Sequence, residues 1–346
     1  MVRSPNEVER IRQEMRAEEV ERLNEQKWQL QMKRKEWDVF PKPPTLKECW
    51  LAHLSMLTGG GRGLSGIRQD FRKKKRVVDK DNVRVYLKNM PKNRYKDVPC
   101  LDETRVILKD CDNDYIHANY MCTKRYAEEV TRFICCQAPK KETLIDHWRM
   151  IEQEGVEVIL MLCDYKLDGK EKCAEYIPTA EKPEMTFGPF TIKLKNTDKV
   201  KWECETAAIV NISTLEVHKE GKVLTEAFAK TRNPMGRKYW PPILVHDSAG
   251  TGWAAVVVLA KMFLEGIRKS MGMGGYLECL LSDVREHRAN AIETEAQYLF
   301  LHKVLIDHLA EVIYAKGQSD VGRFKYEYNE FLKTLNGEKK IPEDWR

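Results

Sequence analysis

A short glycine-containing segment between two apolar runs constrains the fold of this 346-residue chain more than any other feature. The segment is Val245–Ala254, with the sequence VHDSAGTGWA. Small residues at Ser248, Ala249, Gly250 and Gly252 let consecutive backbone N–H groups point inward at the start of a helix. Such a nest binds anions, and the helix dipole adds a favourable field. The segment therefore predicts an anion-binding turn.

The flanking runs indicate what this turn connects. Pro242–Val245 is typical of a short buried strand, and Ala254–Ala260 is typical of an apolar helix. An ordinary tight connection between a strand and a helix would show the same pattern. The rest of the chain has to decide between the two interpretations.

The frame of the turn resembles the signature of protein tyrosine phosphatases, which runs His-Cys-Ser-Ala-Gly-x-Gly-Arg and then Ser or Thr. In that family the cysteine is the nucleophile and the arginine clamps the phosphate. Asp247 stands at the cysteine position, Trp253 at the arginine position and Ala254 at the hydroxyl position. The resemblance implies a phosphatase frame whose catalytic positions are degenerate.

Other segments resemble the same family in the same order, over roughly residues 45–315. In the segment Lys92–Val98, the resemblance implies that the ring of Tyr95 flanks the substrate ring and that Asp97 holds the peptide backbone. The shared order implies an α/β fold of the protein tyrosine phosphatase type, with a twisted mixed β-sheet flanked by α-helices. Val156–Cys163 predicts a central strand of that sheet. The remaining matching stretches are Asp114–Tyr120, Phe133–Pro139, Asp146–Ile151 and Gly169–Pro178.

The two main replacements change the chemistry of the loop. Asp247 keeps a negative charge and can accept the same N–H groups, so it is expected to act as an internal anion without the nucleophilicity of a thiolate. Trp253 removes the bidentate guanidinium. A carboxylate about 4 Å from a phosphate repels it by roughly 4 kcal/mol per unit charge at an effective dielectric of about 20. We therefore expect neither tight phosphate binding nor turnover.

Two further catalytic parts of the family depart from its pattern. The window Ile209–Tyr239 contains no Trp-Pro-Asp tripeptide, and Trp240–Pro242 lies too close to Asp247 to replace it. In the later glutamine-bearing loop, Gln297 fits the second glutamine, but Glu293 replaces the first. No residue can be assigned as the general acid.

Composition indicates an intracellular globular protein. A hydrophobic content of 42% is ample for a core, and the net charge of +6 does not demand nucleic acid. No apolar run suggests secretion or membrane insertion. The ten cysteines lack paired metal spacing, so reduced cytosolic thiols are expected, with no metal and no cofactor. The basic run Arg72–Arg76 leaves nuclear import open, although charge runs are usually solvated surface.

Three regions are expected along the chain. Residues 1–40 form a charged helical extension, because Glu7–Glu36 is rich in charged helix formers and ends before Pro41. Residues 41–315 form the phosphatase-like domain. Residues 316–346 form a helical and charged tail, in which Phe324–Leu335 is amphipathic.

These observations favour a catalytically inactive pseudophosphatase that acts as a binding, scaffold or sequestering module in phosphotyrosine or kinase signalling. Its expected partner is a protein, such as a kinase or a kinase substrate. Two alternatives stay open: a tyrosine phosphatase with residual or altered phosphate-ester hydrolase activity, and a structural assembly protein. The oligomeric state is not determined. The expected binding residues are Tyr95, Asp97, His246, Asp247, Ser248, Ala249, Gly250, Thr251, Gly252, Trp253 and Gln297.

Overall fold

The computed structural model describes residues 46–74, 78–122, 132–202, 208–224, 241–268, 276–313 and 318–337. The chain divides into two units, Met1–Thr45 and Leu46–Arg346, and the fold below is that of the second unit. The predicted helical extension, residues 1–40, lies outside the described residues, and so do residues 225–239 of the window that lacks the Trp-Pro-Asp tripeptide.

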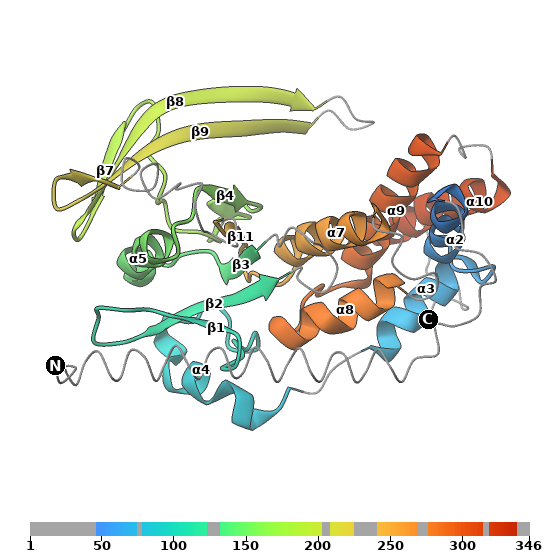
Figure 1. The fold of residues 1–346 in the computed structure, drawn as a ribbon, viewed down its shortest axis with the longest axis horizontal. Helices are drawn as coiled ribbons and strands as arrows, with labels where there is room; N and C mark the ends of the chain where they lie inside the picture. The colour runs from blue at the N-terminus through green and yellow to red at the C-terminus, as the bar shows by residue number, and fades with distance from the viewer. Residues whose placement is uncertain are drawn as a thin grey trace, which may run out of the picture. The chain divides into compact units, whose positions relative to one another are not determined.

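A mixed five-stranded sheet carries the turn (Figure 1). β11 pairs in parallel with β3 on one side and with β4 on the other, while β1, β2 and β3 run antiparallel. The sheet therefore places the carboxyl end of β11 between two parallel neighbours. In sheet order the strands are β1 (Arg105–Ile107), β2 (Tyr115–Cys122), β3 (Arg132–Gln137), β11 (Ile243–Asp247) and β4 (Val158–Met161).

The prediction of a central strand within Val156–Cys163 is wrong. The strand forms as β4, but among the described residues it stands last in the sheet order, and β11 holds the interior position. Its apolar character has another cause: Leu160 packs against one core cluster and Ile159 against the other. A strand covered on both faces reads as a continuous apolar run wherever it stands in the sheet.

Side chains alternate between the two faces of the sheet. On β3, Phe133 and Cys135 join one core cluster, while Ile134 and Cys136 join the other. This two-residue period is what a strand imposes on a sheet covered on both sides. The first cluster lies under a layer of helices, namely α2 (Leu46–Leu57), α3 (Gly63–Lys73), α7 (Trp253–Arg268), α8 (Tyr276–His287), α9 (Glu295–Val312) and α10 (Ser319–Leu335).

The second cluster lies under α5 (Leu144–Glu154) and the base of a separate four-stranded sheet (Figure 1). That sheet has the order β10-β9-β8-β7, and its two long strands form an antiparallel ribbon. The strands are β7 (Glu184–Phe187), β8 (Phe190–Trp202), β9 (Ala208–Lys219) and β10 (Lys222–Val223).

Smaller elements complete the described part of the chain. A short hairpin joins β5 (Lys166–Leu167) to β6 (Lys170–Glu171), and α4 spans Arg84–Lys88. Three 3-10 turns cover Lys80–Val83, Met90–Lys92 and Lys141–Thr143. Across the described ranges, no helix combines the length and the apolarity that a membrane span requires.

The amphipathic segment predicted near the carboxyl end forms α10, which contributes to the first core cluster. Phe324 on this helix is fully buried, whereas Tyr326 is 69% exposed. We expect Phe324→Ala to lower the free energy of unfolding by about 3–5 kcal/mol, because it leaves a cavity in the core. Urea unfolding followed by circular dichroism measures this change. Tyr326→Ala is the matched control, expected within about 0.5 kcal/mol of the native chain; equal effects would show that α10 is not part of the core.

Candidate functional site

The predicted order of strand, turn and helix is confirmed. β11 ends at Asp247, and α7 begins at Trp253. Gly250 has a φ of 74°, and a Cβ atom built on it would lie 2.2 Å from the backbone oxygen of Cys136. Only glycine fits this position, because the backbone is left-handed and the neighbouring strand leaves no room for a side chain.

The side chain of Asp247 occupies the interior of the turn. Its Oδ1 accepts hydrogen bonds from the backbone N–H of Ala249, at 3.0 Å, and of Gly250. Its Oδ2 accepts from the N–H of Ala254 in the first turn of α7, at 2.9 Å. Asp247 is buried, and the helix dipole favours its negative charge. The predicted position of the Asp247 carboxyl group, as acceptor of the N–H groups of the turn, is therefore confirmed.

A second charged side chain, Arg288, binds the backbone carbonyl groups of the turn. Arg288 is fully buried, and its guanidinium donates to the carbonyl oxygens of Ala249 and Gly250, each at 2.9 Å. It also donates to Asn119 Oδ1, at 2.6 Å, and contacts His117 Nδ1 at 3.0 Å. Burial, and then the charge of Arg288, lowers the pKa of His117 to about 3, so this imidazole is neutral and can accept the contact. Sequence reasoning did not find Arg288.

The recognition segment lies against the turn. The hydroxyl groups of Tyr95 and Ser248 are 2.7 Å apart and share a hydrogen bond. The neighbouring Arg94 donates to the carbonyl oxygen of Pro139 at 2.7 Å, which fixes the segment to the end of β3. Asp97 is exposed. The structure thus brings Tyr95 to the rim of the loop that carries Asp247.

Glu293 reaches the turn from the loop before α9, and Gln297 reaches it from the first turn of α9. The hydroxyl of Thr251 donates to the carboxylate of Glu293. Gln297 Oε1 accepts from the backbone N–H of Glu293, at 3.0 Å, and of Thr294, at 3.2 Å, and so closes a capping box at the start of α9. A Cβ atom built on Gly252 would lie 3.3 Å from Asp247 Oδ2 and 3.3 Å from Glu293 Oε2. Two carboxylates therefore converge at one point of the turn.

These residues surround an open cavity of about 1100 Å³. Trp253 stands on its wall, 42% exposed, with its ring edge-on to Phe300 at a centroid distance of 5.2 Å. His246, Gly250 and Thr251 do not line the cavity, contrary to expectation, because all three are buried. The expected binding residues that do line it are Tyr95, Asp97, Asp247, Ser248, Ala249, Gly252, Trp253 and Gln297.

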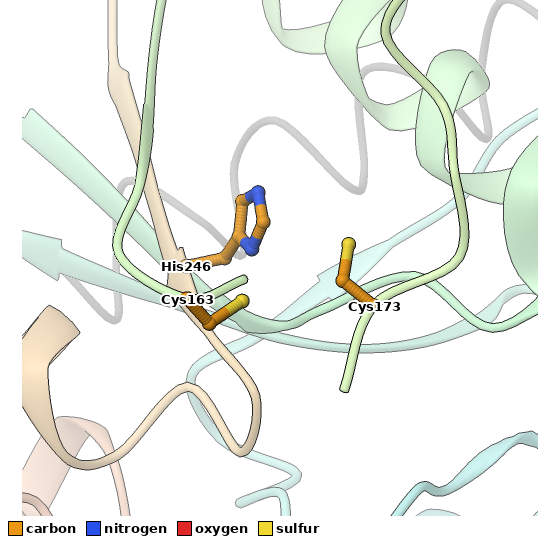
Figure 2. A group of neighbouring side chains, drawn as sticks. All are labelled: Cys163, Cys173 and His246. Atoms are coloured by element: carbon orange, nitrogen blue, oxygen red, sulfur yellow. The ribbon is translucent and has the colours of Figure 1, made fainter. Parts of the chain in front are cut away.

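A group of soft ligand atoms lies beside the cavity (Figure 2). The sulfur atoms of Cys163 and Cys173 and a ring nitrogen of His246 all lie within 4.8 Å of one another. A hydrogen bond with the Cys173 thiol lowers the pKa of Cys163 to about 6, although burial opposes the shift. Sequence spacing missed this group because its members come from distant parts of the chain.

The family model described as protein-tyrosine phosphatase matches residues 89–307. The chain belongs to this family. Tyrosine phosphatase-like protein J1 of Microplitis demolitor bracovirus is 31% identical over 251 residues, which cover 64% of this chain and 82% of that protein.

Other members of the family are comparably similar. Mouse tyrosine-protein phosphatase non-receptor type 7 is 30% identical over 240 residues, which cover 64% of this chain and 65% of that protein. Among solved structures, PTPN18 in complex with HER2 phosphopeptides has a TM-score of 0.59 and 26% identity, covering 76% of this chain and 99% of that chain. The predicted family and fold class are therefore confirmed.

The buried guanidinium of Arg288 can be tested by its removal. We expect Arg288→Met to lower the free energy of unfolding by about 3 kcal/mol or more, because it leaves the carbonyl oxygens of Ala249 and Gly250 without a donor. Urea unfolding measures this loss. Arg84→Met, at an exposed ion pair with Asp81, is the control and should change stability by less than about 1 kcal/mol. A small loss at Arg288 would contradict its supporting role.

Glu293 predicts a dependence of stability on pH. Glu293 is exposed as a whole, but desolvation of its carboxyl group beside the turn raises its pKa above the ordinary value of 4.5; the hydrogen bond from Thr251 opposes this shift, and the charge of Asp247 reinforces it. The folded state then keeps a proton that the unfolded state has released, so stability falls as the pH rises from the ordinary value through the raised one.

Replacing Glu293 by glutamine should remove this loss. We expect Glu293→Gln to be more stable than the native chain at neutral pH, and the advantage to disappear below the ordinary glutamate pKa. Urea unfolding between about pH 4 and pH 8 gives the difference. Glu286→Gln, an exposed glutamate of α8, is the control. An advantage of Glu293→Gln that is the same at every pH would show that charge is not its cause.

Proposed function

We propose that this chain is a pseudophosphatase, a catalytically inactive member of its family that binds a protein partner at the cavity beside Asp247. The observation that supports this proposal most is the hydrogen bonding of the Asp247 carboxylate to Ala249, Gly250 and Ala254. These N–H groups belong to the nest that would hold a phosphate in the resembling signature. An anion that is part of the chain already engages them.

The charges around the turn support the same proposal. A bound phosphate dianion would meet Asp247 and Glu293, whose carboxylate oxygens converge beside Gly252. At the arginine position of the signature, the indole of Trp253 packs on Phe300 and offers no positive charge. Repulsion by two carboxylates and loss of the bidentate clamp both disfavour binding of phosphate.

The same chemistry describes the partner that the cavity favours. Carboxylates in a partly enclosed space attract a basic side chain or the hydroxyl of an unmodified tyrosine. The rim supplies Tyr95, whose ring stands beside the loop, and the exposed carboxylate of Asp97. The solved relative PTPN18 holds phosphopeptides, and we propose that this chain presents the same face to an unphosphorylated protein segment in kinase signalling, within the cell.

Family membership favours a second candidate, a phosphatase with residual or altered activity, because named relatives are phosphatases. In this candidate Asp247 would have to act as nucleophile while its carboxylate is held by three N–H groups. Hydrolysis of an aryl phosphate decides between the candidates. Activity that disappears in Asp247→Asn would support the enzyme and contradict the pseudophosphatase.

Phosphate binding gives a direct test of the occupied nest. We expect the double variant Asp247→Cys, Trp253→Arg to bind inorganic phosphate at least about 100-fold more tightly than the native chain, because two charge-assisted hydrogen bonds are restored and a repulsive charge is weakened. Isothermal titration calorimetry measures both affinities. Trp253→Phe is the control for the change at the indole. Equal affinities for native chain and double variant would contradict the proposal.

A peptide pair tests the partner chemistry. One tyrosine peptide, with flanking basic residues, is titrated into the native chain in its unmodified and phosphorylated forms. We expect the unmodified form to bind more tightly, and the triple variant Tyr95→Ala, Asp97→Ala, Asp247→Asn to lose this binding. Asp112→Ala, at an exposed aspartate outside the cavity lining, should bind normally. Tighter binding of the phosphorylated form would make the chain a phosphotyrosine reader and contradict the proposed partner.

A further inference from the structure

Three potential metal ligands meet near the carboxyl end of β11 (Figure 2). Cys163 follows β4, Cys173 follows β6, and His246 lies on β11 directly before Asp247. Their ligand atoms lie within 4.8 Å of one another, and Figure 2 shows the three side chains turned toward a common centre. Among the described residues, this is the only group of three or more potential metal-binding side chains whose ligand atoms lie so close together.

One buried nitrogen of the group lacks a well-formed hydrogen bond. His246 is fully buried, and its Nε2 lies 2.6 Å from the hydroxyl oxygen of Tyr176. Its Nδ1 is also buried and makes no hydrogen bond of good geometry with any described residue, and the polar side chain that it meets is the Cys163 thiol. A buried polar atom without a partner costs free energy and needs an explanation. A ligand bound at Nδ1 supplies one.

We propose that Cys163, Cys173 and His246 form a binding site for Zn²⁺. Two sulfur atoms and one imidazole nitrogen are the ligand types that Zn²⁺ takes in proteins, and zinc sites with three protein ligands keep one open position. Zn–S bonds of about 2.3 Å in a tetrahedron place two sulfur atoms roughly 3.8 Å apart. The observed separations, all within 4.8 Å, need only small rotations of the side chains.

The surroundings fit a metal better than a disulfide. When Nδ1 binds the metal, Nε2 carries the proton and donates a hydrogen bond to the hydroxyl oxygen of Tyr176. This hydrogen bond fixes the tautomer and the orientation of the ring. Two thiolates balance the charge of one Zn²⁺. A disulfide between Cys163 and Cys173 would use the same sulfur atoms but would leave His246 Nδ1 without a partner.

The site links three segments beside the proposed partner surface. It would connect the segment after β4 and the segment after β6 to the strand that carries Asp247. Cys163 lines the cavity, so the fourth position of the metal can face it and hold water. This inference is independent of the proposed function, because it concerns residues behind the turn and requires neither catalysis nor its absence.

Metal content of the full chain tests the proposal. The reduced, metal-free protein is titrated with Zn²⁺ alone, and bound zinc is measured by mass spectrometry after removal of free metal. We expect one equivalent per chain and a rise in Tm of about 5 °C at a hundredfold excess over Kd. Cys163→Ser should lose both effects. Cys111→Ser, at another partly buried cysteine, is the matched control and should keep both.

Cys173 and His246 are buried, so replacing either side chain disturbs the core. A second measurement therefore uses the native chain instead of the variants Cys173→Ser and His246→Gln. Co²⁺ bound to the native chain should show thiolate-to-metal charge transfer and the strong visible bands of tetrahedral coordination. Zn²⁺ should also protect Cys163 and Cys173, but not Cys111, from alkylation. Absence of zinc binding by the native chain, equal binding by Cys163→Ser, or a Cys163–Cys173 disulfide in the freshly isolated protein would each overturn the proposal.

Discussion

The hydrogen bonding of Asp247 is the interaction on which the arrangement of the site depends. A turn of small residues at the start of a helix exposes N–H groups that need an acceptor. In this chain the acceptor is covalently part of the turn, because Asp247 stands at the end of the strand that enters it. The loop is therefore satisfied without a ligand. Arg288 donates hydrogen bonds to the carbonyl oxygens of Ala249 and Gly250 in the same turn. Backbone N–H groups and backbone carbonyl groups of the turn therefore both have charged partners.

The sequence predicted the fold to the extent that local patterns determine it. The short strand before the turn, the apolar run of α7 and the glycine at position 250 each follow from a local requirement, and each appears as predicted. The position of β4 in the sheet was predicted wrongly, since strand order depends on pairing between distant segments. An apolar run reports burial on both faces and carries no information about the neighbouring strands.

The candidate site also combines features that local sequence determines with features that depend on distant segments. The internal anion at Asp247 was predictable because its acceptor atoms and the N–H groups lie within eight positions of one another. Arg288 and the Cys163, Cys173 and His246 group could not be predicted in this way, because tertiary packing brings them together. A buried arginine and an unpartnered imidazole nitrogen become visible only when burial and contacts are known. The partner surface stays a prediction for the same reason, since its occupant is a different molecule.

The long ribbon formed by β8 and β9 has a consequence for local stability. Its base belongs to the second core cluster through Phe190, Ile192 and Val217, and β7 and β10 pair only with that base. Farther out, Val200 and Ile212 are exposed. An isolated pair of strands is only marginally stable in water. The outer ribbon therefore opens without unfolding the core, and its amide protons exchange with solvent long before those of β11.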